Sequence, residues 1–443
     1  MGNPAGERRY VAGQPARVKR RRHSRDIGNA PKPSPVAARR RTECLAPPPI
    51  RTRRGRIRYD RLMAIIDTTG ALEALVAELE HAPYVALDTE FIRDQTYWPK
   101  LCLMQVAAPG IEAIIDPLAE GIDLASFYAL LRAPVVKVLH AARQDIEIFF
   151  IQGNVIPDPL FDTQIAAMVC GFGESASYET LARRLAHAEI DKSARFTDWS
   201  RRPLTKRQLE YALADVTHLR VVYEALVRQL ERSGRAAWVQ EEIVALQQPA
   251  LYRLDPALAW KRLRPRTTNK RFLCMLAVVS AWREREAQSR DVPRNRILKD
   301  EVLLEIAAHP PESAQALEHI RSIPKGFAAS RMGRALLEEI VKGGSADLPA
   351  GSEPERPRRK REPSPSAVDL LKTLLRQRAE TAGVAPRLIA DADDIEKLAA
   401  HEDDGVAALQ GWRAEVFGDD AVALRDGKLA LALRNGEAVL VKL

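Results

Sequence analysis

Val85-Ala86-Leu87-Asp88-Thr89-Glu90-Phe91 is a short, mostly apolar run that contains two carboxylates. Its length and composition are typical of a buried strand. Side chains two residues apart in a strand point to the same face, so Asp88 and Glu90 would lie about 7 Å apart on one face. A buried charge is costly unless it is paired or bound to a metal ion. A divalent cation is the simplest counter-charge, but the same Asp-x-Glu spacing recurs twice elsewhere, so a site needs further carboxylates.

The segments around this run predict an α/β domain. Strand patterns are expected over 85–91, 101–107, 113–116 and 135–140, and helical patterns over 71–79, 146–151 and 163–247. The first three strands follow one another without a helix between them, which indicates an antiparallel meander. Strands mixed with helices in this order predict an α/β domain over residues 63–250.

Composition is that of a globular protein with several domains. The chain has 443 residues, of which 46% are hydrophobic and 29% are charged, and this length predicts two to four domains. The longest apolar run covers only 272–282, well below the roughly 18 residues of a membrane span. The four cysteines form no Cys-x-x-Cys pair and the first residues lack the apolar core of a secretory signal. We therefore expect a cytoplasmic protein with no membrane segment and no zinc site.

The positive charge is concentrated at the N-terminus. Residues 1–62 hold 18 of the 68 Lys and Arg and 4 of the 59 Asp and Glu, so residues 63–443 hold 50 basic and 55 acidic residues. The first segment is rich in Arg and Pro and has no periodicity, which predicts a disordered basic extension. It is either an arm that grips RNA or a stretch upstream of a translation start at Met63.

The pattern of apolar residues predicts helices in the second half of the chain. A helical domain is expected over 255–342, with 272–285 as its most apolar helix. Residues 343–364 collect Gly, Pro and Ser around a basic run and have the composition of a linker. A third, smaller helical unit is expected over 365–443.

Two more acidic positions are candidates for a site with the first pair. Asp145 follows a predicted strand at the start of a helix, where the ordinary alternative is a helix N-cap. Asp215 and Tyr211 are four residues apart in a strongly helical stretch and so lie about 6 Å apart on one helix face. The ordinary alternative there is a surface or boundary pair.

Taken together, Asp-x-Glu on a first strand, Asp after a later strand and Tyr-x-x-x-Asp on a late helix resemble the DEDD exonuclease superfamily, and the tyrosine marks its DEDDy branch. The segments 87–93, 96–105 and 198–204 resemble the ribonuclease D family within it. Trp282-Arg283-Glu284 together with residues 291–296 resembles the HRDC domain, a helical module shared by helicases and ribonuclease D.

This resemblance implies a ribonuclease H-like exonuclease domain with a mixed sheet, followed by two all-α HRDC-like domains. It also implies a 3′–5′ exoribonuclease that releases 5′-mononucleotides from RNA with a free 3′ end, acting on tRNA precursors in tRNA 3′ maturation. We expect a monomer. The alternative functions are those of a DNA exonuclease of the proofreading type on the same fold, and of a non-catalytic RNA-binding protein. The second is disfavoured because all four carboxylates and the tyrosine are present.

By resemblance, Asp88, Glu90 and Asp215 would hold the ion that binds the attacking water, and Asp88 and Asp145 would hold a second. Oxygen ligands favour Mg²⁺ or Mn²⁺ over zinc. Two carboxylates 4 Å apart repel by about 4 kcal/mol at an effective dielectric of 20, so the cluster calls for bound cations. Tyr211 would orient the water, since a phenol with a pKa near 10 is a poor base.

Other polar and aromatic residues are weaker candidates. His140 is an alternative base, but its place at a strand end favours a structural role. Phe91 is the candidate for stacking on a base of the substrate, with core packing as the alternative. Turns and caps are expected at Asp116, Asp162 and Asp198. Phosphate contacts from the HRDC-like region would come from Arg294, Arg296 and Lys299, which otherwise form a solvated helix face.

Overall fold

The computed structural model describes residues 65–343 and 362–443. The expected N-terminal extension (1–62) and most of the expected linker (343–364) lie outside the described residues. Among those described, no helix combines the length and the apolar character needed to cross a bilayer.

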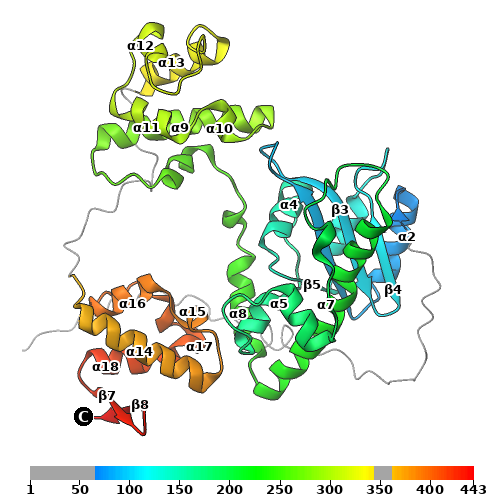
Figure 1. Cartoon of the computed structure of the whole chain (residues 1–443), viewed down its shortest axis with the longest axis vertical. Coiled ribbons are helices and arrows are strands. Elements are labelled where there is room, and N and C mark those ends of the chain that lie inside the picture. Colours follow the sequence, from blue (N-terminus) through cyan, green and yellow to red (C-terminus); the bar gives the residue numbers. More distant parts are fainter. Residues whose placement is uncertain (1–64, 344–361) are drawn as a thin grey trace, which may run out of the picture. The chain divides into compact units, whose positions relative to one another are not determined.

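A six-stranded mixed sheet forms the centre of the region that covers residues 65–251 (Figure 1). Its strands are β1 (Ile65–Ile66), β2 (Tyr84–Ile92), β3 (Lys100–Ala108), β4 (Ile111–Ile115), β5 (Val136–Leu139) and β6 (Leu160–Asp162). The order across the sheet is β1-β4-β3-β2-β5-β6. The meander β2-β3-β4 is antiparallel as expected, while β5 joins β2 and β6 joins β5 in parallel. The short strand β6 was not expected, because three residues are too few to show a period of two.

Helices cover the sheet and follow it in sequence. They are α2 (Thr69–Leu79), α3 (Ala125–Arg132), α4 (Arg143–Gly153), α5 (Thr163–Val169), α6 (Tyr178–Leu181), α7 (Lys206–Ser233) and α8 (Ala236–Leu246). Shorter turns are η1 (Ala182–Ala186), η2 (Lys192–Ala194) and η3 (Pro249–Leu251). The mixed sheet and its helices confirm the predicted fold class of this region.

The long helix α7 packs against β2, β3, β4 and β5. It begins at a capping box in which Thr205 Oγ1 accepts a hydrogen bond from the backbone N–H of Gln208, and Gln208 Oε1 accepts one from the backbone N–H of Thr205. Two orphan N–H groups at the helix start are thereby satisfied. The helix ends at Gly234, whose φ of 68° is the left-handed conformation that glycine adopts without strain.

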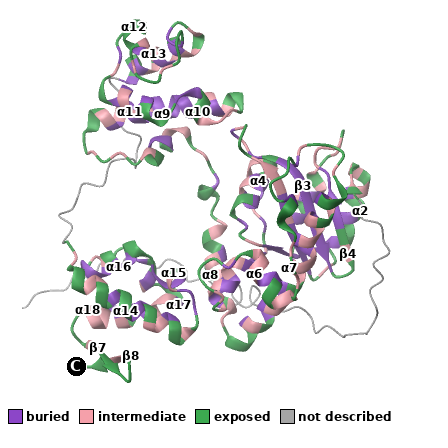
Figure 2. Ribbon diagram, viewed as in Figure 1, coloured by how far each residue is buried: buried purple, intermediate pink, exposed green. Residues whose placement is uncertain are grey.

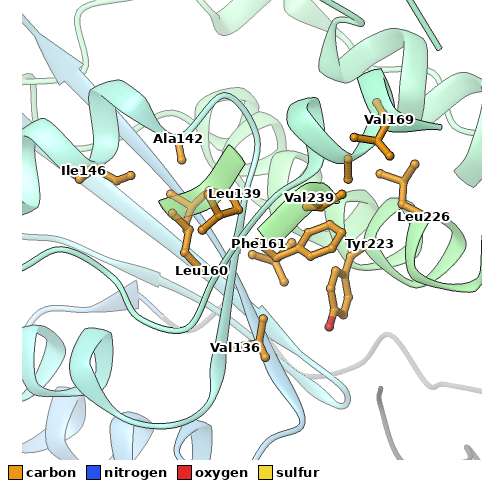
Figure 3. Close-up of a cluster of buried hydrophobic side chains, with 14 of the residues drawn as sticks. Val136, Leu139, Ala142, Ile146, Leu160, Phe161, Val169, Tyr223, Leu226 and Val239 are labelled. Atoms are coloured by element: carbon orange, nitrogen blue, oxygen red, sulfur yellow. The ribbon is translucent and has the colours of Figure 1, made fainter. Parts of the chain in front are cut away.

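The apolar faces of several helices meet the parallel edge of the sheet in one core (Figure 3). Phe161 of β6 lies beside Tyr223 of α7, with ring centroids 4.9 Å apart. Figure 2 shows that burial follows the strands and the inner faces of the helices. Because this core holds α4 and α7 on the sheet, it sets the positions of their polar residues.

The region that follows, expected over 255–342, is helical, as predicted. It contains η4 (Pro256–Leu263), α9 (Lys270–Arg290), α10 (Arg294–Ile297), α11 (Asp300–Ala308), α12 (Ala314–Glu318) and α13 (Arg331–Gly343). The expected apolar helix is α9, which packs against η4, α11 and α13. Its start is capped by the Asn269 side chain, and it ends at Asp291 in the left-handed conformation.

The last unit is helical up to residue 425 and then forms a hairpin. Its elements are α14 (Pro365–Ala382), α15 (Pro386–Ile389), α16 (Ala392–Ala399), η5 (Ala407–Leu409), α17 (Gly411–Arg413), η6 (Ala414–Gly418), α18 (Asp419–Arg425), β7 (Leu429–Arg434) and β8 (Glu437–Lys442). The all-α expectation therefore does not extend to β7 and β8. Asn435 and Gly436 have φ values of 54° and 85°, and Asn-Gly in this conformation is the preferred two-residue hairpin turn.

Candidate active site

Three carboxylates that are far apart in the sequence come together above the sheet. Asp88 and Glu90 lie on β2, and Asp215 lies on α7, which crosses that strand. One oxygen from each of the three lies within 4.8 Å of the others. The regular pairing of β2 with β3 shifts between Glu90 and Phe91. Such a bulge re-aims the side chains beside it, and here it ends the strand's regular alternation directly after the second carboxylate.

Asp145 reaches the same cavity from the first turn of α4. Thr89 donates a hydrogen bond from its Oγ1 to Asp145 Oδ1 at 2.5 Å. The N-cap position belongs to Ala142, so Asp145 does not fill the capping role that its sequence position suggested. The tight turn that carries it here includes Ala141 at a φ of 56°, a conformation that costs a non-glycine residue about 1 kcal/mol.

Burial and mutual repulsion raise the proton affinity of the whole cluster. The pKa of Asp88 is held well above its usual value by burial and then by the charges of Asp215, Asp145 and Glu90. Burial, followed by Asp215 and Asp145, raises the pKa of Glu90 to about 9. Burial is also the main reason that the pKa values of Asp145 and Asp215 rise to about 7. None of the four carboxyl groups makes an ion pair within the described residues, and bound cations would remove the repulsion.

Tyr211 lies one turn before Asp215 on α7 and lines the cavity. Burial raises the pKa of its phenol above the usual value, and the charges of Asp215, Glu90 and Asp88 raise it further. The hydroxyl therefore stays protonated near neutral pH. Such a group can orient a water molecule by hydrogen bonding but is a poor general base.

The cavity has a volume of about 500 Å³. Phe91 lines the cavity and at the same time packs, half-buried, against the main core, so both base stacking and core packing are compatible with its position.

His140 also lines the cavity, but its Nδ1 lies 3.0 Å from Thr163 Oγ1. Burial lowers the pKa of His140, which keeps the ring neutral. These contacts favour a structural role for the histidine.

Several lining residues were missed from the sequence. They are Gln144, Gln164, Tyr178, Lys192, Arg195 and Phe196. Tyr178 is fixed by a hydrogen bond that its hydroxyl donates to the Ala214 carbonyl at 2.9 Å. Lys192, Arg195 and Phe196 precede the 198–204 segment, and two cations beside an aromatic residue were the signal that could have found them.

The carboxylates that the sequence placed outside the site have structural partners. Arg202 donates hydrogen bonds from Nε and Nη2 to Asp116. Asp162 caps α5 and accepts hydrogen bonds from the backbone of residues 141 and 142. Asp198 accepts hydrogen bonds from the amide and hydroxyl of Ser200.

Arg294 was expected to contact phosphate, but in the structure it is not available for this role. Its guanidinium donates hydrogen bonds to both carboxylate oxygens of the buried Glu284, at 2.5 and 2.6 Å. A bidentate pair of this kind commits the arginine to its partner. Arg296 and Lys299 are exposed and remain candidates, and Lys299 Nζ also lies 3.6 Å from a carboxylate oxygen of the exposed Glu301.

Comparison with known proteins agrees with this fold. Residues 63–231 match the 3′–5′ exonuclease domain family, and residues 275–340 match the HRDC domain family. The ribonuclease D of Granulibacter bethesdensis is 48% identical over 381 residues, covering 85% of this chain and 96% of that protein. The ribonuclease D of Gluconacetobacter diazotrophicus is 49% identical, covering 83% and 94%.

A solved structure also resembles the chain over most of its length. It is Escherichia coli RNase D, described as an exoribonuclease involved in structured RNA processing. The identity is 30%, the TM-score is 0.70, and the match covers 83% of this chain and 99% of that one.

Proposed function

The chain belongs to the ribonuclease D family of 3′–5′ exoribonucleases, and from this premise we propose that it matures the 3′ ends of tRNA precursors by two-metal hydrolysis. The exoribonuclease activity itself follows from family membership. The choice of tRNA precursors is supported by the description of the E. coli relative, which processes structured RNA. The products would be 5′-mononucleotides.

The observation that carries the site proposal is the convergence of Asp88, Glu90 and Asp215 within 4.8 Å, with Tyr211 one turn away on α7. Exonucleases of this family depend on divalent metal ions. The donor set fits such ions, because it offers only oxygen ligands, carries excess negative charge and holds no cysteine.

We assign one ion to Asp88, Glu90 and Asp215 and a second to Asp88 and Asp145. Two Mg²⁺ or Mn²⁺ ions, when bound, supply activation of a water and stabilisation of the leaving 3′ oxygen. Asp88 would contact both ions. Thr89 holds the Asp145 carboxylate in place, and the protonated Tyr211 hydroxyl orients the water for in-line attack.

We propose a monomeric, cytoplasmic enzyme whose exonuclease domain covers 63–250 and whose HRDC-like domains cover 255–342 and 365–443. The described cysteines, Cys102, Cys170 and Cys274, are all free thiols, in keeping with a reducing compartment. Light scattering on the purified chain tests the monomer, and limited proteolysis tests the domain boundaries.

The decisive experiment is digestion of a 3′-extended tRNA and a matched single-stranded DNA by the full chain with Mg²⁺, Mn²⁺ or chelator. We expect metal-dependent trimming of the tRNA, loss of trimming in Asp88→Ala, and wild-type trimming in the exposed control Asp94→Ala. Trimming by Asp88→Ala would refute the site. A preference for the DNA would instead support the proofreading-type alternative.

A further inference from the structure

The segment that precedes α7 adds to the cavity the kinds of side chain that the carboxylate cluster lacks. Lys192, Arg195 and Phe196 line the same cavity as Asp88 and Glu90. A cavity with only carboxylates would hold metal ions but would offer nothing for a nucleobase and would repel the RNA backbone. Cationic and aromatic groups beside each other are what single-stranded nucleic acid binding requires.

Arg195 is a cation without a carboxylate partner. Lys192, the other cationic side chain of this segment in the cavity lining, is committed to an ion pair with Glu179. Arg195 makes no ion pair within the part of the chain that the structure describes, and its guanidinium lies over the Phe196 ring, 5.3 Å from the centroid. Its charge nevertheless acts on the cluster, where it opposes the rise in the pKa values of Glu90 and Asp215 that burial causes.

Phe196 is the most exposed large hydrophobic side chain among the described residues, at 90% exposure. Phe91, the aromatic residue that the sequence suggested for stacking, packs against the main core, whereas Phe196 belongs to no core cluster. A phenylalanine left in water gains free energy when an apolar surface covers it. Since the ring lies at the rim of a cavity that receives an RNA end, a base is a ligand of suitable shape and chemistry.

We propose that Arg195 and Phe196 grip the 3′ end of the RNA, with the Phe196 ring stacked on one of the last two bases and the Arg195 guanidinium on the adjoining phosphate. This inference rests on RNA being the substrate. Stacking tolerates every base because each has a π-face, so the grip suits an enzyme that must remove nucleotides in succession. The cation over the ring strengthens the platform by holding the two side chains side by side.

The proposal is tested by RNA binding measured without catalysis. The full chain carrying Asp88→Asn is titrated in chelator against a 5′-labelled single-stranded RNA, and Kd is read by fluorescence anisotropy. We expect Phe196→Ala to weaken binding by roughly 5- to 150-fold, the range of base–aromatic stacking, and Phe196→Trp to retain affinity. Leu433→Ala, which truncates another exposed apolar residue outside the cavity lining, is the matched control and should leave Kd unchanged.

Substrates that lack one base identify the stacked nucleotide. Two substrates are compared, one without the base of the last nucleotide and one without the base of the next-to-last. One of the two should bind more weakly to the Phe196-containing protein, and that loss should be much smaller in Phe196→Ala. This non-additivity is the signature of direct contact. If neither substrate shows it, or if Phe196→Ala binds as tightly as its parent, the stacking role is overturned.

The salt dependence of Kd tests the arginine. Each phosphate contact on a single strand contributes about 0.7 to the slope of log K against log salt concentration. Arg195→Ala should reduce the slope by about that amount, Arg195→Lys should preserve it, and Arg201→Ala should not change it, since Arg201 is 84% exposed and paired with Asp198. An unchanged slope in Arg195→Ala would overturn the phosphate contact.

Kinetics separate this proposal from the proposed function. In the otherwise wild-type chain, Phe196→Ala should raise KM for single-stranded RNA with little change in kcat, because stacking is made equally in the ground state and the transition state. A fall in kcat with KM unchanged would contradict it. If the wild-type chain trims single-stranded RNA but not 3′-extended tRNA, the tRNA proposal fails while the grip can still be measured.

Discussion

Replacing Asp88 by asparagine should stabilise the metal-free protein, although the residue lies in the proposed metal site. One oxygen each from Asp88, Glu90 and Asp215 lies within 4.8 Å of the others. Two unit charges at that separation repel by about 3.5 kcal/mol at an effective dielectric constant of 20. The substitution keeps the shape of the side chain and removes up to two such repulsions.

Protonation of the carboxyl groups in the native state limits how much Asp88→Asn can stabilise the metal-free protein. Burial, followed by neighbouring charges, raises the pKa of Glu90 to about 9, and burial raises that of Asp215 to about 7. The native protein therefore relieves the repulsion by holding protons that the unfolded chain releases. Keeping one carboxyl protonated at pH 7 against an unfolded pKa near 4 costs about 4 kcal/mol. We accordingly expect Asp88→Asn to raise the free energy of unfolding by about 2–4 kcal/mol at pH 7 in chelator.

The sign of the pH dependence follows from the same shifts. Because the native state binds more protons than the unfolded state, the stability of the metal-free wild type should fall as the pH rises from about 4, the unfolded pKa, to about 9, the folded pKa of Glu90. Each carboxyl that is protonated only in the native state contributes a slope of about 1.4 kcal/mol per pH unit. The fall should be shallower in Asp88→Asn. Saturating Mg²⁺ should stabilise the wild type and have little effect on the variant.

The assay is thermal denaturation of the full chain at pH 5, 6, 7 and 8, in chelator and in Mg²⁺. For a domain of about 150–250 residues, 1 kcal/mol corresponds to roughly 2–4 °C, so the shift is easily resolved. Asp116→Asn is the matched control and should lower the melting temperature, because that carboxylate is paired with Arg202. A lower melting temperature for Asp88→Asn in chelator would show that carboxylate repulsion does not destabilise the metal-free protein, and an Mg²⁺-induced rise as large as that of the wild type would show that Asp88 does not hold the ions.

Three further variants test the elements that support the site. Tyr211→Phe should lower kcat by about 10²- to 10⁴-fold with KM for RNA unchanged, and an unaltered kcat would exclude a role in orienting the water. Thr89→Val should weaken Mg²⁺ binding measured by calorimetry, because the Asp145 carboxylate loses its hydroxyl donor; equal affinity would contradict this. Thr205→Ala should cost about 1 kcal/mol in unfolding experiments through loss of the α7 capping box, and Lys206→Ala beside it should cost less.

Local patterns predicted much of the architecture. The strand around Asp88, the meander that follows it and the helix carrying Tyr211 and Asp215 all lie where residue spacing placed them. The family resemblance, the exonuclease fold and the helical HRDC region are confirmed by the comparisons. Where a local signal was overlooked, as with Asn435-Gly436 between two apolar runs, the expected helical unit turned out to end in a hairpin.

Other features were beyond any local pattern. Asp145 has the sequence position of an N-cap, yet its side chain turns to Thr89 and the cavity because the left-handed Ala141 places the cap one turn earlier, at Ala142. Arg294 lies in a basic segment of the sequence that suggested an exposed phosphate ligand, yet its guanidinium is hydrogen-bonded to the buried Glu284. A side chain's partner depends on which elements pack beside it, and spacing along one helix carries no information about that.

Residue spacing is enough to predict which side chains share a face. Asp88 and Glu90 share one because strand side chains alternate with a period of two, and Tyr211 and Asp215 share one because a helix turns every 3.6 residues. These periods arise from backbone hydrogen bonds between near neighbours. Residue spacing does not predict that the two faces meet within 4.8 Å or that Arg195 and Phe196 line the same cavity; both depend on the packing of the folded chain. Burial of apolar surface between α7 and the sheet brings them together, and that free energy is gained only when distant segments pack.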